Sequence, residues 1–392
     1  MSAHIVCLTS GGGLPIFTRK RGEGDPLPFS VVASLNGVHM FGKSQDVVLQ
    51  NTSTQETTFV WKEMEDSVIL IAAARGASSN LLEKLLVTVF HAMILVVGIE
   101  EIRAPKNADR LKRELRVCYP LVDRLLECLE STSYTDLLGL DEVILCQENF
   151  MLQSLLEAYC ECLGSLFGCL LLHGCTAVAT PSWWSLEPNE RKLLKLLIAS
   201  EGQASARDIP VFLPCKSPGV PFRLVTCSLV AGVDVCVLCG PTPPLSEVEH
   251  TAIQCWKSAL DLIRAAEQCY PRNFPHAIQL DSGVMGLLLV DQDVGKFMLS
   301  RNQTHAEGKK DAHRFDVLRT FYHQGASMLY KNSDAPHAVE TYWCSEYHKC
   351  HAYRQGNILL CVLYAAAVPS HTMRIITRHT LRLLTSDKQL CW

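Results

Sequence analysis

Apolar and polar positions along the chain follow one order of elements that repeats three times, although the sequence itself does not repeat. Each copy opens with two short apolar runs around a turn, which predicts a β-hairpin. The turns contain glycine, which permits the positive φ that tight turns need. The predicted strand pairs are residues 4–9 with 14–18, 165–172 with 175–180, and 284–290 with 296–300.

A helix is predicted after each hairpin, at residues 29–41, 187–200 and 311–329. The third is the clearest, because Phe315, Leu318 and Phe321 fall at helical spacing on one face. Further strands are predicted at 57–61, 68–73, 222–230, 235–239 and 358–365. A long helix closes each copy, at 81–97, 247–268 and 372–385, and the first copy gains a charged amphipathic helix at 107–130.

The repeated order β-β-α-β-β-β-α predicts an α+β fold of three longin-like domains. Each domain is expected to contain an antiparallel five-stranded sheet flanked by helices on both faces. Three copies are better evidence than one, because chance recurrence of the whole order is less frequent. Turn and breaker residues near 131–141 and 270–275 divide the chain into domains at residues 1–130, 145–270 and 276–392.

The composition agrees with a globular protein of several domains. The chain has 392 residues, of which 48% are hydrophobic and 19% charged. A net charge of −4 gives no global attraction for nucleic acid, so no nucleic-acid partner is expected. The 18 cysteines are expected to be reduced, buried residues of a cytosolic protein, because residues 1–10 lack the basic start and apolar core of a secretory signal.

The most apolar segment, residues 81–99, is predicted to be a buried helix rather than a membrane anchor. Glu83, Lys84, Thr88 and His91 interrupt it. Its uninterrupted apolar stretches are therefore shorter than the roughly 20 residues that a membrane span requires.

Gly37 to Ser44 satisfies the G-x-x-x-x-G-K-[ST] pattern of a phosphate-binding P-loop. A P-loop needs a buried strand before the glycines and a helix after the Lys-Ser pair, so that backbone N–H groups converge on phosphates. Residues 45–59 are rich in threonine and β-branched residues and carry no helical apolar repeat. The match is therefore interpreted as accidental. The alternative is a nucleotide-dependent enzyme that uses Gly37, Gly42, Lys43, Ser44 and, for magnesium, Asp291.

Two groups of cysteine and histidine have spacings that suggest metal ligands. Cys236 and Cys239 lie in an apolar strand, where residues three apart point to opposite faces, so their thiols should not converge on one ion. The second group fits no common zinc template, and its aromatic neighbours favour a hairpin. That group consists of Cys344, His348, Cys350 and His351. No metal, cofactor or catalytic residue is predicted.

Basic residues recur at intervals of three or four on two predicted helices, so they form ridges. One interpretation is a solvated surface. The other is contact with phosphoinositide headgroups or an acidic partner, where each Lys or Arg contributes roughly 1 kcal/mol near an anionic membrane. Arg19, Lys20 and Arg21, in the predicted loop before the first helix, would add to such a patch. The lipid-binding candidates are Lys106, Arg110, Arg113, Arg374, Arg378 and Arg382.

Five short segments carry a more specific signal than the order of elements. They are residues 27–43, Phe59-Val-Trp-Lys62, Gly98-Ile-Glu-Glu101, Trp183-Trp184 and Cys239-Gly-Pro-Thr-Pro-Pro-Leu-Ser246. These segments resemble the Fuzzy family of planar cell polarity effectors, and the resemblance weakens after Pro275.

The resemblance implies a non-catalytic scaffold of three longin domains that forms a heterodimer with an Inturned-like tri-longin protein. It implies that the pair binds or activates a Rab-like small GTPase and supports ciliogenesis and protein transport to the cilium. A WD-repeat planar cell polarity effector and a phosphoinositide membrane surface are further implied partners. The implied location is the cytoplasm at the ciliary basal body, with peripheral membrane association.

In related exchange factors the first longin domains contact the GTPase switch regions, so the resemblance points to the end of the first helix and its following loop. The GTPase-binding candidates are Asn36, Gly37, His39, Met40, Phe41 and Lys43. The alternative for Met40 and Phe41 is that they pack on their own sheet. The alternative for the function is an effector adaptor that holds a GTP-loaded GTPase without exchanging its nucleotide.

Overall fold

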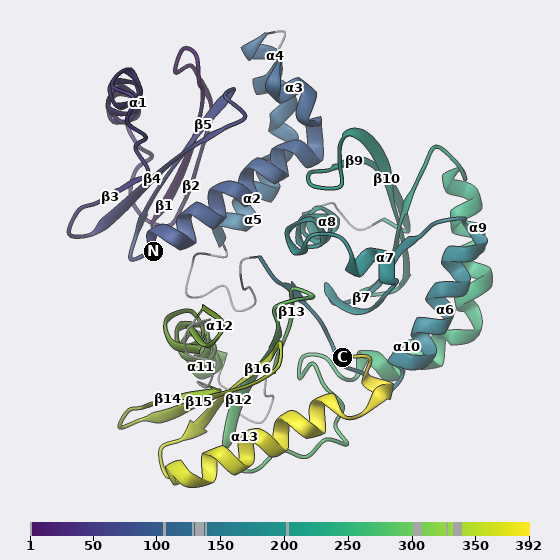
Figure 1. Cartoon of the computed structure of the whole chain (residues 1–392). Helices are drawn as coiled ribbons and strands as arrows, with labels where there is room; N and C mark the ends of the chain where they lie inside the picture. The colour runs from purple at the N-terminus through teal and green to yellow at the C-terminus, as the bar shows by residue number, and fades with distance from the viewer. Residues whose placement is uncertain are drawn as a thin grey trace. The chain divides into compact units, whose positions relative to one another are not determined.

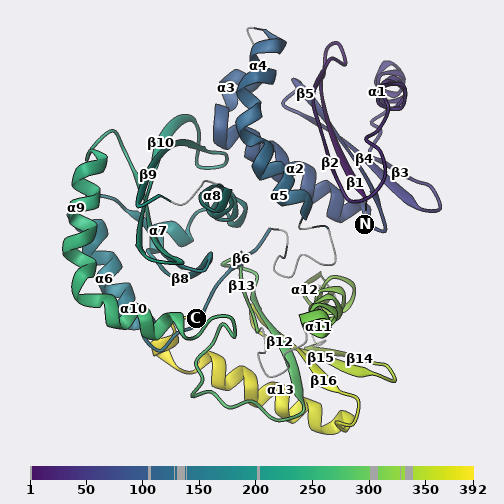
Figure 2. The same cartoon turned by 180° about the vertical axis from the view of Figure 1, so that it is seen from behind.

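The computed structural model describes residues 2–104, 107–127, 129, 137, 139–200, 204–300, 308–326, 328–331 and 339–392. The described strands form three sheets, one in each predicted domain range, and each sheet carries helices on both faces (Figure 1, Figure 2). The predicted α+β class is confirmed, and each sheet contains the predicted opening hairpin.

The first sheet is antiparallel, with the strand order β2-β1-β5-β4-β3. Helix α1 (Phe29–Ser44) lies on one face, and α2 (Ser79–Val97) with α5 (Tyr119–Glu127) lies on the other (Figure 1). The strands are β1 (Ala3–Thr9), β2 (Pro15–Arg21), β3 (Asn51–Ser53), β4 (Thr57–Met64) and β5 (Val68–Arg75). Between α2 and α5 lie α3 (Ile99–Arg103), α4 (Ala108–Glu114) and the 3-10 turn η1 (Leu115–Cys118).

Helix α2 is the central helix of the first domain. The Ser78 side chain accepts the backbone N–H of Leu81 at its start, and Gly98, with φ of +80°, follows its end. Within the described residues α2 is the one helix long and apolar enough to cross a membrane, yet 56% of that segment is buried inside the protein. Its apolar residues belong to the core, which supports the prediction of a buried helix.

The second sheet has the order β8-β7-β11-β10-β9. Helices α7 (Pro181–Trp184) and α8 (Pro188–Ser200) lie on one face, and α6 (Asn149–Cys162), α9 (Leu245–Trp256) and α10 (Leu260–Glu267) lie on the other (Figure 2). The 3-10 turn η2 (Lys257–Ala259) joins α9 to α10. The strands are β7 (Phe167–Leu172), β8 (Cys175–Ala179), β9 (Ala206–Leu213), β10 (Ser217–Val230) and β11 (Val233–Cys239).

Helix α6 was not among the predicted elements. Its signal was present, because Leu152, Leu156 and Tyr159 recur at helical spacing and are all buried. The segment precedes the hairpin with which every predicted copy begins, so the repeated order alone has no place for it.

The third sheet has six strands, in the order β14-β15-β16-β12-β13-β6, rather than the predicted five. The extra strand β6 (Asp141–Glu142) comes from the segment between the first two domain ranges and pairs in parallel with β13 (Lys296–Leu299). The other strands are β12 (Val284–Asp291), β14 (Glu340–Cys344), β15 (His348–Gln355) and β16 (Ile358–Ala365). The helical elements are α11 (Gly308–Phe321), the π-helical turn η3 (Tyr322–Ala326), α12 (Met328–Lys331), α13 (Ser370–Thr385) and the 3-10 turn η4 (Lys388–Leu390).

The described residues within 134–191, 203–208 and 224–392 form one compact unit, which buried polar contacts hold together. The Asn149 side-chain amide donates to the carbonyls of Ala177 (3.1 Å) and Leu390 (3.2 Å). Arg191 and Asp141, both wholly buried, lie 3.8 Å apart. Asp141, at the predicted domain boundary, and Asn149 therefore contribute to a buried polar seam between the second and third sheets.

Candidate functional site

The residues of the P-loop pattern, 37–44, all lie inside helix α1. Backbone N–H groups within a helix bond to the preceding turn, so they cannot converge on a phosphate. Asp291 accepts the backbone N–H groups of Asp293 (3.1 Å) and Val294 (3.2 Å), which makes it the cap of its own turn. The geometry of these residues therefore does not support the alternative of a P-loop nucleotide-dependent enzyme.

The inner face of α1 is fixed to its sheet by apolar and polar contacts. Val32 and Leu35 pack against the cluster that contains Trp61, and the Trp61 indole N–H donates to the Leu35 carbonyl (3.2 Å). The Asn36 amide rests on Gly13 in the hairpin turn, where φ is +63° and an added Cβ would lie 2.1 Å from Asn36 Nδ2. Asn36, a GTPase-binding candidate, is therefore half-buried and holds α1 in place.

Glu63 on β4 anchors the second half of α1. It accepts a hydrogen bond from Lys43 Nζ (2.6 Å) and another from the Ser10 hydroxyl. Burial raises the pKa of Glu63, but these two hydrogen bonds outweigh it, so the pKa lies below its usual value. The Lys43 ammonium is consequently engaged within its own domain rather than free for a partner.

His39 is only 5% exposed, and its Nε2 lies 3.9 Å from Glu63 Oε2. Burial lowers the pKa of His39, and Glu63 opposes that shift. The prediction that His39 faces a partner is therefore corrected, because its ring lies under the helix.

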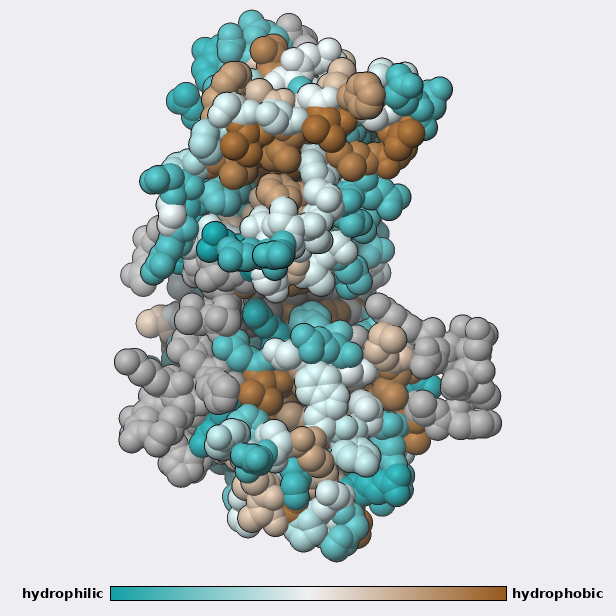
Figure 3. All heavy atoms as spheres, turned by 90° about the vertical axis from the view of Figure 1, so that its left-hand side faces the viewer, coloured by the Kyte–Doolittle hydropathy of each residue, from teal (hydrophilic) through white to brown (hydrophobic). Residues whose placement is uncertain are grey.

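The outer face of α1 carries apolar side chains that its own domain leaves uncovered. Phe41 is 70% exposed, and Met40 and the neighbouring Gly37 are also exposed, so Met40 and Phe41 do not pack on their own sheet. Figure 3 shows hydrophobic residues gathered on this side of the first domain. We call this surface the α1 apolar face, and it consists of Phe29, Val31, Val38, Met40, Phe41, Val47 and Val48.

A groove of about 640 Å³ lies beside the α1 apolar face. It is lined by Lys43, by the loop of residues 46–51, by β4 and by the start of α2. Lys62 and Glu83 form an ion pair at 2.5 Å among its lining residues. An apolar area next to a polar border is the usual anatomy of a protein–protein interface.

The exposed residues Phe29, Val38, Val47 and Val48 were missed as candidates. The signal that could have found them is the distribution of apolar residues on α1, which is not confined to the one stripe that a sheet can cover. Glu63 carried no such signal, because its contact with Lys43 joins residues 20 positions apart and depends on the tertiary fold.

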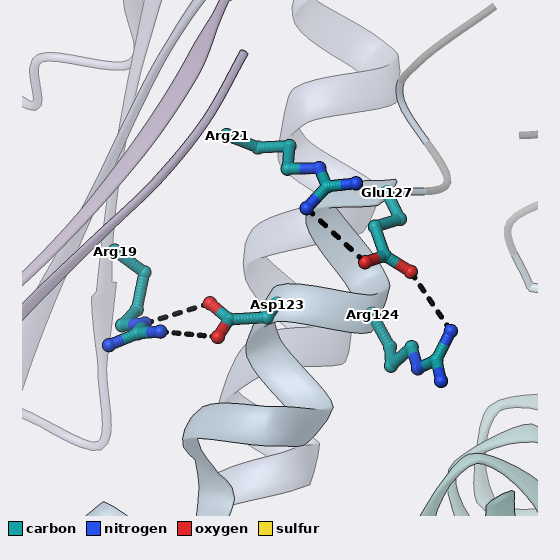
Figure 4. A network of polar contacts seen from close by, with 5 residues as sticks. All are labelled: Arg19, Arg21, Asp123, Arg124 and Glu127. Atoms are coloured by element: carbon teal, nitrogen blue, oxygen red, sulfur yellow. Dashed lines mark hydrogen bonds and ion pairs between the residues drawn. The ribbon is translucent and has the colours of Figure 1, made fainter. Parts of the chain in front are cut away.

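Arg19 and Arg21 lie in strand β2, not in a loop, and face α5 (Figure 4). Both oxygens of Asp123 accept from the Arg19 guanidinium, with Nε to Oδ1 at 2.8 Å, and these hydrogen bonds raise the pKa of Arg19. Arg21 lies 3.4 Å from Glu127. The suggestion that these arginines extend a lipid-binding patch is corrected, because they bind carboxylates of their own domain.

The basic ridge at residues 107–130 is interrupted, since that segment forms α4, η1 and α5 instead of one helix. Arg110 donates to Glu114 (2.8 Å) within α4. Arg113 is exposed on the same helix. Lys106 lies outside the described residues.

The basic ridge on α13 is present. Arg374 and Arg378 both approach the Glu340 carboxylate, Arg378 at 3.6 Å, while Arg382 is exposed. Behind them the His351 ring contacts the Thr377 hydroxyl (2.9 Å). Burial and the Arg378 charge lower the pKa of His351 to about 4.

Cys350 and His351 lie on opposite faces of their strand, and so do Cys236 and Cys239. Cys350 belongs to the core under α11, and burial raises its pKa to about 12, whereas its neighbour His351 faces α13. Cys239 lies in the core of the second domain, and Cys236 lies outside that cluster although it is buried. In the described part of the chain, no group of three or more His, Cys, Asp or Glu could hold a metal ion.

Family models match three separate regions of the chain. They are described as the first, second and third Longin domain of FUZ, MON1 and HPS1 and cover residues 3–125, 163–257 and 283–388.

Relatives match almost the full length. Protein fuzzy homolog of Xenopus tropicalis is 37% identical over 98% of both chains. The fuzzy homologs of Rattus norvegicus and Homo sapiens are 35% and 34% identical, over 98% of this chain and 97% of theirs. The chain therefore belongs to the fuzzy family of tri-longin-domain proteins.

Proposed function

We propose that this longin-domain protein is a non-catalytic subunit that pairs with an Inturned-like tri-longin protein and presents the α1 apolar face to a Rab-like small GTPase. The observation that carries the proposal is the exposure of Phe41 and Val38 on a helix whose opposite face is fixed. Exposed apolar patches rimmed by polar groups mark interaction sites on soluble proteins.

The attachment of α1 suits it for binding. Trp61 and Gly13 contact one turn of the helix, at Leu35 and Asn36, and Glu63 holds Lys43 about two turns later. A helix held in this way loses little conformational entropy when a partner docks, which favours affinity. Phe41, Met40 and Val38 would supply the apolar centre of the interface, and the charged groove residues Lys43, Lys62 and Glu83 part of its polar border.

Nucleotide exchange of this kind would need shape rather than an acid–base pair. Apolar side chains that hold a switch region away from the nucleotide loosen magnesium and phosphate contacts by differential binding. The family resemblance supports this mode, together with roles in planar cell polarity, ciliogenesis and protein transport at the ciliary base. A WD-repeat planar cell polarity effector remains a further proposed partner.

The second part of the proposal is membrane contact through α13. Arg382 is exposed there, and Ile375 is an exposed apolar residue on the same helix. Glu340 offsets part of the positive charge of Arg374 and Arg378, so Arg382 should dominate electrostatic binding to phosphoinositides on this helix. Arg110 and Arg113 on α4 are the corresponding candidates in the first domain.

Liposome flotation tests the membrane contact. Arg382→Glu should reduce flotation with phosphoinositide vesicles, and Arg110→Glu should reduce it less, because Glu114 already pairs with Arg110. Equal flotation of wild type and Arg382→Glu would remove α13 from the membrane surface.

Release of labelled GDP tests the GTPase proposal. The chain is co-expressed with its Inturned-like partner and mixed with GDP-loaded Rab-like GTPases, with either subunit alone as the control. Faster release only with both subunits would establish a composite exchange factor. Stable binding of the GTP-loaded form without faster release would establish the effector adaptor, and no binding of either form would refute the proposal.

For the GTPase test, Phe41→Glu is a better variant than Lys43→Glu. Lys43→Glu places a second carboxylate beside Glu63, so a loss of GTPase recruitment could come from a displaced helix. Phe41→Glu changes an exposed side chain and leaves that ion pair in place. The matched control is Leu166→Glu in the second domain, because Leu166 is 71% exposed and Phe41 is 70% exposed.

A further inference from the structure

Two accessible cysteines depart from the expectation that the thiols are buried. Among the described cysteines, most are buried, four are exposed and Cys255 is half-buried. Cys162 is one of the exposed residues and is the last residue of α6. Cys255 lies in the last turn of α9. Both helices belong to the second domain.

Helices α6 and α9 lie side by side in the layer that covers one face of the second sheet (Figure 1, Figure 2). The rings of Tyr159 and Trp256 meet edge to face at 6.2 Å between the two helices. Leu156 and Ala252 belong to the same buried core. The two helices are thus packed closely along a shared apolar seam.

The two thiols lie at the solvent edge of this seam. Cys162 follows Tyr159 by three residues, and Cys255 follows Ala252 by three, so each lies one turn beyond a residue of the seam. The Cys162 thiol is close enough to Cys255 to contribute, after burial, to the raised pKa of Cys255. Two neighbouring thiols on adjacent, closely packed helices are candidates for a disulfide.

We propose that Cys162 and Cys255 form a redox-active dithiol, and that a hydroperoxide converts them into a disulfide that ties α6 to α9. No motif assigned this pair a role, and neither cysteine belongs to the α1 apolar face. The proposal identifies a modification site whose co-reactant is a small peroxide.

The reaction balances in two steps. The Cys162 thiolate attacks a peroxide oxygen, the O–O bond breaks, and Cys162 becomes a sulfenic acid while water or an alcohol leaves. The Cys255 sulfur then attacks the Cys162 sulfur, the S–O bond breaks, and the departing hydroxide takes the Cys255 proton as water. A dithiol reductant reverses the change and is oxidised in turn.

The environments of the two thiols set their order of reaction. Cys162 is exposed, so peroxide reaches it directly. Burial raises the pKa of Cys255, which reduces its thiolate fraction and suits it to the second, resolving step.

A second pair in the same domain provides an internal control. Cys146 and Cys269 are also neighbours that shift one another's pKa, but both are buried. Peroxide must reach a thiol to oxidise it, so this pair should stay reduced under conditions that link Cys162 to Cys255. The comparison therefore tests whether peroxide access, and not only the closeness of two thiols, decides which pair is oxidised.

The test oxidises the full-length chain with graded hydrogen peroxide and maps disulfide-linked peptides without reduction. The expected result is a Cys162–Cys255 peptide that dithiothreitol removes, at peroxide levels that leave Cys146 and Cys269 unlinked. In Cys255→Ser, Cys162 should instead accumulate as a sulfenic acid that dimedone labels. The thermal midpoint of the wild type should rise on oxidation, because the link restricts the unfolded chain, and that of Cys162→Ser should not.

Two outcomes would overturn the proposal. One is oxidation of the exposed Cys215, Cys344 or Cys391 with no Cys162–Cys255 peptide. The other is linkage of Cys146 to Cys269 at the same peroxide level, which would show that access does not govern the reaction. The wild-type peptide map requires no substitution, so a variant that fails to fold does not weaken the test.

Discussion

Helices α1 and α8 hold the same place in the first and second domains, after the opening hairpin and before the remaining strands, yet they are covered very differently. Helix α8 buries four apolar residues, Leu193, Leu194, Leu197 and Ile198, and it also buries Glu190, Arg191 and Lys192. Helix α1 buries only Val32 and His39 of its 16 residues.

The position of a helix in the fold therefore does not decide how much of its surface is covered. Arg191 on α8 donates to the carbonyls of Trp184 and Gly295, so its burial is matched by hydrogen bonds. Phe41 and Val38 on α1 are apolar and exposed. Packing against the described residues of their own domain therefore does not explain why these positions are apolar. The equivalent helices are therefore covered differently: α8 contributes to a buried polar seam, whereas α1 exposes the face that we propose as a partner-binding surface.

The largest effect is expected on α8. Arg191→Met removes the charge beside the buried Asp141 and leaves backbone carbonyls without their donor, which should lower the free energy of unfolding by about 3–5 kcal/mol. Urea denaturation followed by tryptophan fluorescence measures it. Arg382→Met, at an exposed position, should change the free energy by less than about 0.5 kcal/mol. Equal effects of the two variants would contradict the structural role of α8.

Acid should destabilise the protein through a second buried polar group, on the sheet face that α13 covers. His351 has a folded pKa of about 4 against an unfolded value of 6.5, and it faces Glu340 on β14, Tyr364 on β16 through Thr377, and Arg378 on α13. Below pH 6.5 the unfolded chain binds a proton that the folded chain does not, so stability falls as pH drops toward 4.

The loss from this histidine should be on the order of 3 kcal/mol at most. Unfolding at a series of pH values, with His351→Gln beside the wild type, measures its share. If the variant lost stability between pH 6.5 and 4 as steeply as the wild type, His351 would not be the group that titrates.

A smaller effect is expected in the hairpin turns. Gly13 and Gly174 both have positive φ, but only Gly13 has a neighbour, Asn36 of α1, in the space of an added Cβ. Gly13→Ala should lower the free energy of unfolding by about 1–2 kcal/mol, and by more than Gly174→Ala does. Both variants strain the backbone at positive φ, but only Gly13→Ala also places its Cβ against Asn36. Thermal unfolding of both variants measures the difference, and equal losses would mean that Asn36 does not hold α1 against the turn.

The smallest effect is expected for the ion pair on α1. Lys43→Gln should lower the free energy of unfolding by less than about 1 kcal/mol, because the Lys43 side chain is half exposed and such pairs contribute little. Chemical denaturation checks this value. If Lys43→Gln lowered the free energy of unfolding as much as Arg191→Met does, the Lys43–Glu63 pair would contribute as much to stability as the buried contacts of α8 do.

Much of the fold followed from residue patterns, because strands and amphipathic helices leave periodic signals. The hairpins and the closing helices α2 and α13 were predicted to within a few residues, whereas the helix predicted at 247–268 is divided into α9, η2 and α10. The strand β6 was not, because two residues pair with β13 only through a tertiary contact. The break of residues 107–130 into α4, η1 and α5 was also missed, although Pro120 near the start of α5 marks it.

The candidate site was predictable in part. The resemblance directed attention to the end of α1, and Phe41 and Met40 are exposed there. The burial of His39 and the contact of Asn36 with Gly13 depend on which side of α1 meets the sheet. Apolar residues on more than one side of the helix left that orientation open.

The most direct test measures the affinity of a Rab-like GTPase for the assembled heterodimer, with the chain as wild type, Phe41→Glu or Leu166→Glu. Removal of an apolar anchor at the centre of an interface costs at least about 2 kcal/mol, so Phe41→Glu should weaken binding by roughly 30-fold or more. Leu166→Glu should bind as the wild type does. Wild-type affinity of Phe41→Glu in a correctly assembled heterodimer would contradict the assignment of the α1 apolar face as the GTPase-binding surface.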